Sequence, residues 1–455
     1  MLSVFGDVRL KQTAFLHIVL IPIESAFQKT KIFGDCQHTT YSEGRGGDSS
    51  TTLKGSGFLA RAFMKKALLH AKVILPDRIL SDGGIEIENG NIVKVFEQDS
   101  VDPSITDRMD CKGLYLSPGF IDIHLHGGGG ADFIDGTEEA VNKVLRAHAK
   151  HGTTAFLPTT VSVAPEVVIK CLKTIEKVQR ARTSGPKILG AHLEGNFFSM
   201  ACKGAQDPKY IFPPTKANYE AIVSSVSNIK MISAAPELEN ALAFAKEMTA
   251  RGIVMSCAHS DATYEQAAKG FDSGFTHITH IYNGNSLIGS PFYYCYIGAS
   301  EASLLYDNVT VEVIADGKHL PKELLRLLYK IKGPDFMNLC TDATRAACMP
   351  PGVYKLGGLD VVVEDGVAAL PDKSSFAGSV CTGDWAVRTA YEAGIPLHDA
   401  VKMITATPAR LLGVYSQMGS ITEGKAADIN LFDENINIKH TLIDGEVYQD
   451  SMKSN

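Results

Sequence analysis

The chain has no run of 18 apolar residues, no Cys-x-x-Cys pair and no dominant basic patch. Without a long apolar run, it is not expected to span a membrane. Without clustered Lys and Arg, and with a net charge of −7, it is not expected to have nucleic acid as its main partner. A hydrophobic content of 45% and a charged content of 21% are those of an ordinary globular protein.

The nine cysteines are dispersed and their number is odd. This usage favours reduced thiols in a cytoplasmic protein over a disulfide framework. Residues 13–23 form a short apolar run after Arg9 and Lys11, which superficially resembles a signal-peptide core. The residues that follow it make a poor cleavage site, so we expect a cytoplasmic location.

The amino-acid composition and the predicted elements change along the 455 residues. Residues 1–63 include a stretch rich in Ser, Thr and Gly (35–57), which predicts a flexible or mis-assigned N-terminal extension, with Met64 as an alternative start. Residues 64–116 predict the first part of a small β domain, with strands at 67–75, 84–88, 91–96 and 114–116 and a hairpin turn at 88–91. Strands at 420–421, 429–433 and 436–447 predict its second part, over 413–450.

Strands and helices alternate through residues 117–412. Apolar strand candidates lie at 155–159, 188–193, 253–258, 275–279, 309–314 and 337–341, and helix candidates at 165–182, 238–251, 264–271, 321–331, 383–393 and 397–405. Repeated alternation of this kind predicts a parallel sheet in an α/β fold. So many units predict a (β/α)8 TIM-like barrel, with the small β domain forming a β-sandwich from both ends of the chain.

Residues able to bind a metal ion recur at the ends of the predicted strands. His124 and His126 are two apart in an extended segment and therefore share one face. The carboxyl ends of barrel strands carry the chemistry, and further strands end in Glu194, His259, His280 and Asp342. Nitrogen and carboxylate donors without cysteine suit Zn²⁺, with Fe²⁺, Mn²⁺ or Co²⁺ as alternatives. A metal would activate water, and we assign the proton-transferring base to Asp342.

Three other histidines have weaker patterns. His192 shares a strand with Glu194, where it either orients that carboxylate or packs structurally. His277 is expected to be structural. His319 follows a strand and either contacts a substrate oxygen or lies in a solvated loop.

As a set, these residues resemble the amidohydrolase superfamily and, within it, the N-acetylglucosamine-6-phosphate deacetylase family. The resemblance spans roughly residues 66–450. It is carried by Pro-Gly-Phe-Ile-Asp-Ile-His-Leu-His-Gly (118–127), Gly-Thr-Thr (152–154), His-Leu-Glu-Gly (192–195), Lys-Gly-Ala (203–205), Ala-Pro-Glu (235–237), His-Ser-Asp-Ala-Thr (259–263), Thr-His-Ile-Tyr-Asn (279–283), Ala-Asp-Gly-Lys-His (315–319), Thr-Asp-Ala (341–343), Ala-Gly-Ser (377–379) and Gly-Lys-Ala-Ala-Asp (424–428).

The resemblance implies metal-dependent hydrolysis of the acetamide of N-acetylglucosamine 6-phosphate, or of a close N-acetyl amino sugar, in amino sugar catabolism. It implies that Glu194, His259 and His280 are the main metal ligands, that His124 and His126 are the additional pair of two-metal members, and that Asp342 is the general acid/base. Positions matching substrate contacts are Ala205, Asn283, Gly284, His319, Phe376, Ala377 and Gly378. The expected partner is a small-molecule amino sugar, and the expected assembly is a homodimer whose partner subunit reaches into the phosphate site.

Three positions depart from the family pattern. Asn196 stands where the family has Pro, and Gln206 where it has His. Residues 289–298 lack the arginine with which the family binds phosphate, a group that Arg and Lys recognise best. Either Lys318 or Arg345 replaces it, or the aromatic residues Phe292, Tyr293, Tyr294 and Tyr296 form a stacking surface for a differently decorated sugar, or these aromatics pack a dimer contact.

Two other functions compete with the deacetylase. Another amidohydrolase would act on a different N-acyl or cyclic amide. Its cyclic-amide subclass typically uses a carboxylated lysine, and no Lys stands at the strand end occupied by Glu194. A catalytically silent barrel would require a broken set of ligands, whereas the set here is intact.

Overall fold

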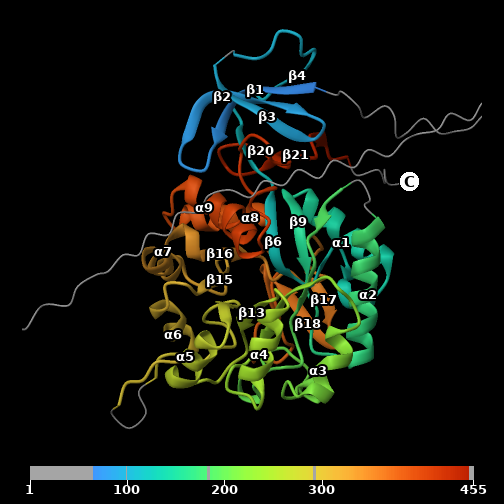
Figure 1. The fold of residues 1–455 in the computed structure, drawn as a ribbon, viewed down its shortest axis with the longest axis vertical. Coiled ribbons are helices and arrows are strands. Elements are labelled where there is room, and N and C mark those ends of the chain that lie inside the picture. Colours follow the sequence, from blue (N-terminus) through green and yellow to red (C-terminus); the bar gives the residue numbers. More distant parts are fainter. Residues whose placement is uncertain (1–64, 99, 182–184, 290–293, 450–455) are drawn as a thin grey trace, which may run out of the picture. The chain divides into compact units, whose positions relative to one another are not determined.

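The structure, a computed structural model, describes residues 65–98, 100–181, 185–289 and 294–449 (Figure 1). The predicted extension 1–63 lies outside the described residues. Within the described ranges the fold is α/β, as predicted: a curled parallel sheet surrounded by helices, and a mixed sheet built from both ends of the chain. No helix in these ranges is long and apolar enough to cross a membrane.

The mixed sheet combines strands that are far apart in the sequence. Figure 1 shows β1–β4 beside β20 and β21. The strand order is β22-β21-β20-β5-β1-β2-β3, with β4 beside β1. The strands are β1 (Lys65–Ile74), β2 (Ile79–Glu88), β3 (Asn91–Glu97), β4 (Asp107–Asp110), β5 (Tyr115–Pro118), β20 (Ile429–Phe432), β21 (Ile438–Ile443) and β22 (Glu446–Val447). The predicted turn at 88–91 is confirmed, because Glu88 pairs with Asn91 around Asn89 and Gly90, which have φ of 52° and 80°.

Two strand predictions near the C-terminus are wrong. Residues 420–421 form no strand, although Ile421 is buried in the core of the mixed sheet. The predicted strand 436–447 is interrupted, because Asp444 and Gly445 take φ of 50° and 79° in a two-residue turn between β21 and β22.

The parallel sheet runs through β6 (Phe120–Leu125), β9 (Thr153–Pro158), β10 (Lys187–Ile188), β11 (Ala191–Leu193), β12 (Ile229–Ala234), β13 (Val254–Cys257), β14 (Phe275–Ile278), β15 (Thr310–Ile314) and β16 (Met337–Cys340). A bridge between Thr159 and His192 continues it from β9 to β11. A bridge between Leu125 and Ala343 joins the ends of β6 and β16. The sheet therefore curls round on itself, consistent with a TIM-like barrel.

Helices follow the strands and cover the outside of the curled sheet (Figure 1). They are α1 (Glu138–Ala149), α2 (Pro165–Ala181), α3 (Lys216–Val223), α4 (Ala241–Ala250), α5 (Tyr264–Asp272), α6 (Ala299–Leu305), α7 (Lys322–Phe336), α8 (Gly383–Glu392), α9 (Leu397–Met403) and α10 (Ala406–Leu411). Helix α2 shows why they pack there: its buried residues Val168, Cys171, Leu172, Ile175 and Val178 recur at helical spacing. The α5 helix begins at a capping box formed by Thr263 and Gln266.

Several elements were not predicted. They include strand β12, helices α1, α3, α6 and α10, and a small antiparallel sheet inserted after β16. That sheet contains β17 (Gly352–Leu356), β18 (Leu359–Glu364) and β19 (Val367–Ala369). The loop that follows β19 supplies Ser375, Phe376 and Gly378 to the pocket described below.

Candidate active site and metal centre

The structure brings the six predicted donor residues to one end of the curled sheet. His124 lies in β6 and His126 just after it, and Glu194 follows β11 directly. His259, His280 and Asp342 each stand two residues beyond the end of a strand, β13, β14 and β16 respectively. All six residues are at most 7% exposed. They form two groups of three whose donor atoms lie within 4.8 Å of one another.

The first group consists of Glu194, His259 and His280. Glu194 Oε1 lies 3.4 Å from His259 Nε2 and 3.3 Å from His280 Nε2. Ligand atoms held at roughly 2.0–2.2 Å from Zn²⁺ in a tetrahedron lie about 3.3–3.6 Å apart. The other ring nitrogen of His259, Nδ1, lies 2.8 Å from the carbonyl oxygen of Cys202, which fixes the ring with Nε2 toward the group.

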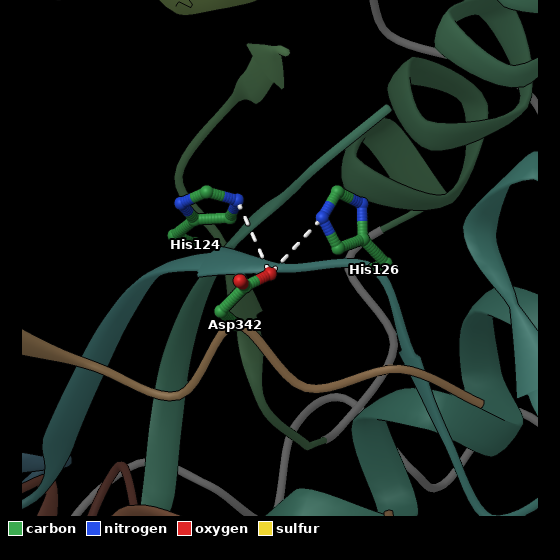
Figure 2. Close-up of side chains that lie close together, drawn as sticks. All are labelled: His124, His126 and Asp342. Carbon is green, nitrogen blue, oxygen red and sulfur yellow. Dashed lines mark ion pairs between the residues drawn. The ribbon is translucent and has the colours of Figure 1, made fainter. Parts of the chain in front are cut away.

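The second group consists of His124, His126 and Asp342 (Figure 2). Both imidazoles face the same carboxylate oxygen, Asp342 Oδ1, at 3.5 Å from His124 Nε2 and 3.2 Å from His126 Nε2. Figure 2 shows the two histidines on one strand and Asp342 on a neighbouring segment. The adjoining backbones are bonded, because Asp342 N–H donates to the carbonyl of His124 at 2.9 Å.

Glu194 lies between the two groups. Its Oε1 is 3.7 Å from His124 Nε2, and its Oε2 is 3.6 Å from His126 Nε2. Gln206 holds this carboxylate in place: its Nε2 donates to Glu194 Oε2 at 3.1 Å, and its Oε1 accepts from Ser162 N–H at 2.8 Å. The family departure at position 206 is therefore a residue that orients Glu194.

The site has the charge and the free donor atoms that suit a cation. Burial by itself lowers the pKa of His124, but neighbouring carboxylates, Glu312 first, outweigh it and raise that pKa to about 10. Burial by itself raises the pKa of Asp342, but the surrounding histidines, His124 first, outweigh it and leave that pKa lowered. Within the described part of the chain, His124 Nε2, which faces the site, is buried and has no hydrogen-bond partner. Nitrogen and oxygen donors arranged in this way could hold a divalent metal ion.

A pocket opens above these groups and encloses about 550 Å³, including space open to solvent. Five of the six donor residues line it; His124 lies beneath them, with no exposed surface. Six of the seven predicted substrate-contacting residues also line it: Ala205, Asn283, Gly284, His319, Phe376 and Gly378. The seventh, Ala377, is buried behind the wall, and its N–H donates to the carbonyl of Ala368.

His319 reaches the pocket rather than lying in a solvated loop. Its Nδ1 lies 2.8 Å from Asp316 Oδ2, and its ring packs against Phe376 in a tilted arrangement, with centroids 4.3 Å apart. These contacts hold the ring against the pocket wall.

No Lys or Arg is found among the described residues that line the pocket. Arg345 is engaged elsewhere, because its guanidinium contacts Asp135 Oδ1 at 2.8 Å and the carbonyl of Lys355 at 2.8 Å. Lys318 is exposed and does not line the pocket either. Gly289 and Tyr296 form an isolated antiparallel bridge, and Tyr294 and Tyr296 are exposed; Phe292 and Tyr293 lie outside the described residues.

Two histidines have partners other than the donor groups. The ring nitrogens of His192 face Ser233 Oγ at 2.8 Å and Thr159 Oγ1 at 3.5 Å, so they do not orient Glu194. His277 is buried beside Thr310, in agreement with the structural role predicted for it. Beneath the site lies Glu312, a residue that the strand-end pattern does not predict; a single charge inside the apolar strand 309–314 is the signal that could have pointed to it.

The chain matches known proteins along most of its length. The model of the amidohydrolase family matches residues 115–448. N-acetylglucosamine-6-phosphate deacetylase of Lysinibacillus sphaericus is 32% identical over 365 residues, which are 79% of this chain and 92% of that protein. N-acetylgalactosamine-6-phosphate deacetylase of Escherichia coli O157:H7 is 30% identical, over 84% of this chain and 99% of that protein.

Among solved structures, N-acetylglucosamine-6-phosphate deacetylase from Pasteurella multocida superposes with a TM-score of 0.80 and is 28% identical, covering 85% of this chain and 100% of that one. The amidohydrolase family is metal-dependent, and the two donor groups described above could bind a metal ion. The chain therefore belongs to the amidohydrolase family and, within it, to the N-acetylglucosamine-6-phosphate deacetylase group.

Proposed function

We propose that this protein hydrolyses the acetamide of an N-acetylated amino sugar 6-phosphate, with N-acetylglucosamine 6-phosphate as the first candidate, to acetate and the amino sugar phosphate. One observation carries the proposal: in a member of this family, Asp342 and the donor group of Glu194, His259 and His280 line the same pocket.

The metal that we propose is Zn²⁺, with Fe²⁺, Mn²⁺ or Co²⁺ as alternatives, bound once or twice per subunit. One ion would be held by Glu194, His259 and His280. A second ion would be held by His124, His126 and Asp342. When bound, the ion would polarise the acetamide carbonyl and lower the pKa of water.

The chain's own residues supply the proton transfers and the positioning. Asp342, kept ionised by its lowered pKa, takes a proton from the attacking water and returns it to the departing amine nitrogen. His319, held by Asp316, contacts the carbonyl oxygen of the substrate. Buried walls keep other water away from the reacting carbon.

Several residues of the pocket wall are assigned to recognition of the sugar and its phosphate. Ala205, Asn283, Gly284, Phe376 and Gly378 line the pocket at the positions we assign to sugar contacts, and Ala377 supports Phe376 and Gly378 from behind. Lys203 is a candidate for the phosphate, because it precedes the lining residue Gly204 and its Nζ lies 3.3 Å from that residue's carbonyl. The relatives in the preceding subsection act on two different amino sugar phosphates, so family membership does not fix the sugar.

We infer further that residues 117–412 form a (β/α)8 barrel and that 64–116 with 413–450 form a small β-sandwich domain, leaving 1–63 as an extension. The pairing of β6 with β16 and the mixed sheet support this division. We propose a homodimer in the cytoplasm that acts on a small molecule and not on nucleic acid or membranes. Free cysteines among the described residues support a reducing compartment.

The direct test is acetate release from four sugars: N-acetylglucosamine and N-acetylgalactosamine, each with and without the 6-phosphate. The proposal predicts turnover of at least one phosphorylated sugar, with kcat/KM at least about tenfold above that of its unphosphorylated form, since charged hydrogen bonds add about 1.5–3 kcal/mol. Turnover of the unphosphorylated sugars alone would agree with the absence of Lys and Arg from the described pocket lining and would overturn the phosphate assignment. No acetate from any of them would favour another amidohydrolase, acting on a different N-acyl or cyclic amide.

The role of Asp342 is tested with Asp342→Asn. We expect kcat to fall by about 10²–10⁴, because an amide cannot accept the proton, while the ion of the Glu194 group stays bound. Metal content by mass spectrometry and acetate release are measured together, with the exposed Asp360→Asn as control. An active Asp342→Asn protein would show that the base is another residue.

A further inference from the structure

Glu312 is a buried carboxylate directly beneath the two donor groups. It lies in β15, between Val311 and Val313, and none of its surface is exposed. Burying a carboxylate costs several kcal/mol unless its oxygens are well paired. A residue so placed needs strong partners, and its carboxylate contacts His124, the backbone of His280, His277 and the buried thiol of Cys340.

One oxygen of Glu312 contacts both donor groups at once. Oε1 lies 2.8 Å from His124 Nδ1 and also accepts from the backbone N–H of His280 at 3.1 Å. Oε2 lies 3.5 Å from His277 Nε2. His124 and His280 belong to different groups, so Glu312 fixes the two groups relative to each other.

The contact with His124 determines which ring nitrogen faces the site. A carboxylate accepts but does not donate, so Nδ1 carries the proton. In the neutral ring, which is the form that binds a metal ion, Nε2 is then the unprotonated nitrogen. It faces Asp342 Oδ1 at 3.5 Å and Glu194 Oε1 at 3.7 Å with no hydrogen-bond partner among the described residues. This is the arrangement in which a histidine presents a lone pair to a metal ion while a carboxylate holds its other nitrogen.

We propose that Glu312 is a positioning residue that makes His124 a ligand of a second metal ion, held by His124, His126 and Asp342. The inference rests on the metal centre proposed above and extends it. Occupancy of the second metal position then depends on Glu312, a residue that touches neither substrate nor metal. Its bond to the other group reaches only the backbone of His280, so the ion at Glu194, His259 and His280 depends on it much less.

The expected effect is on the second ion alone. Loss of a residue that orients a ligand typically weakens metal affinity by roughly 10–100-fold. Glu312→Leu, which removes both acceptors, should therefore raise the Kd of the second ion by that factor and change the first Kd by less than about threefold. Glu312→Gln, which keeps an acceptor for Nδ1–H, should recover most of the loss.

The experiment titrates the full-length protein, freed of metal by chelation, with Co²⁺ and follows its visible absorption together with the bound metal per chain. The matched control is Thr310→Val, which removes a partner of His277 on the same strand and should leave both affinities unchanged. A double-mutant cycle with His124→Ala tests whether Glu312 acts through His124: in that background Glu312→Leu should have no further effect on metal affinity.

Two Co²⁺ per wild-type chain, selective weakening of the second by Glu312→Leu and non-additivity with His124→Ala would support the inference. It is overturned if wild-type protein binds one ion, if Glu312→Leu leaves the second affinity unchanged, or if both ions weaken equally. If Glu312→Leu does not fold, Glu312→Ala, which also removes both acceptors, replaces it in the cycle with His124→Ala, and additive effects there contradict the inference. Acetate release is assayed separately, so failure of the deacetylase proposal is distinguishable from failure of this one.

Discussion

At the scale of single residues, the site is built on strained backbone. His259, His280 and Asp342 follow strand ends with φ of 45°, 30° and 47°, in the left-handed region that side chains with a Cβ disfavour. Such conformations cost about 1–3 kcal/mol each and persist where the surroundings impose them. Around Asp342 the surroundings are two backbone hydrogen bonds, to His124 O at 2.9 Å and from Ser379 N–H at 2.7 Å. The strained backbone at these three positions thus directs three functional side chains into one pocket.

Asn196 shows why this sequence departs from the family at that position. Its φ is 71°, which proline cannot adopt, and its N–H donates to Ser162 Oγ at 3.0 Å. Its side chain also donates to the carbonyls of Val163 and Tyr210. We expect Asn196→Pro to destabilise the protein by about 3 kcal/mol or more, measured by urea unfolding. Asn196→Gly keeps the backbone and should cost less; equal stability of the Pro variant and wild type would contradict this account.

The sequence predicts the six donor residues, but it does not predict the residues that hold them in place. The rule that chemistry stands at strand ends locates His124, His126, Glu194, His259, His280 and Asp342, because it depends only on strand positions. Gln206 and Glu312 support these donors from the side and from below, and their contacts join residues 12 and 188 positions apart. The lone charge in the apolar strand 309–314 marks Glu312 as unusual, but no pattern local to either residue specifies its partner, which only the folded arrangement identifies.

At the scale of elements, the residues in the turns explain which hairpins the sequence predicts, and they also mark hairpins that were not predicted. Asn-Gly at 89–90 predicts the β2–β3 hairpin, which the structure confirms. Gly357-Gly358 and Asp365-Gly366 are equally strong hairpin signals, with positive φ at all four residues, and they form the β17–β19 sheet that was not predicted. The alternation of strands and helices predicts only parallel strands in this region, so it does not indicate a purely antiparallel insertion.

A partly buried pair of charges joins two elements away from the pocket. His151, before β9, has Nδ1 3.2 Å from Asp384 Oδ1 in the first turn of α8. Burial by itself lowers the pKa of His151, but the hydrogen bond to Asp384 and the contact with Cys348 outweigh it and raise the pKa to about 10. The raised pKa means that protonated His151 stabilises the folded state.

The sign of the pH dependence follows from this shift. The contribution of His151 is fully present below its unfolded pKa of about 6.5 and is lost as the pH rises through about 10. We expect the free energy of unfolding to fall between pH 7 and 10, and to fall less steeply in His151→Gln. Chemical denaturation across this range measures both slopes, and parallel curves for the two proteins would show that the pair contributes nothing.

At the scale of the whole described chain, distant segments are joined by a few buried polar contacts. Asp122 in β6 accepts from Thr341 Oγ1 at 2.6 Å, next to the bridge between Leu125 and Ala343 that joins the ends of the curled sheet. The mixed sheet unites β1–β5 with β20–β22 across about 300 residues. Alternation of elements predicts the α/β class, the number of units predicts a barrel, and the terminal strands predict that the chain ends share a domain. None of these patterns specifies the long-range contacts that join the ends of the curled sheet.

Lys187 is one of these long-range contacts. Lying in β10, it reaches Asp428 at 2.7 Å and Asp444 at 2.7 Å, beside the C-terminal strands. Removing one partner of a buried pair leaves an uncompensated charge, and Asp428 is only 5% exposed. Lys187→Met should therefore lower the free energy of unfolding by about 3 kcal/mol. Lys187→Arg keeps the charge and is the control; a Met variant as stable as the Arg variant would show that the contact is dispensable.

The central claim is metal-dependent deacetylation at the pocket containing Glu194, His259, His280 and Asp342. It is tested most directly by acetate release from N-acetylglucosamine 6-phosphate, comparing the protein freed of metal by chelation with the same sample after Zn²⁺ is restored. The account predicts that activity falls at least about 100-fold on metal removal, since loss of the ion removes several kcal/mol of transition-state stabilisation, and that it returns with Zn²⁺. Undiminished acetate release from metal-free protein would contradict it.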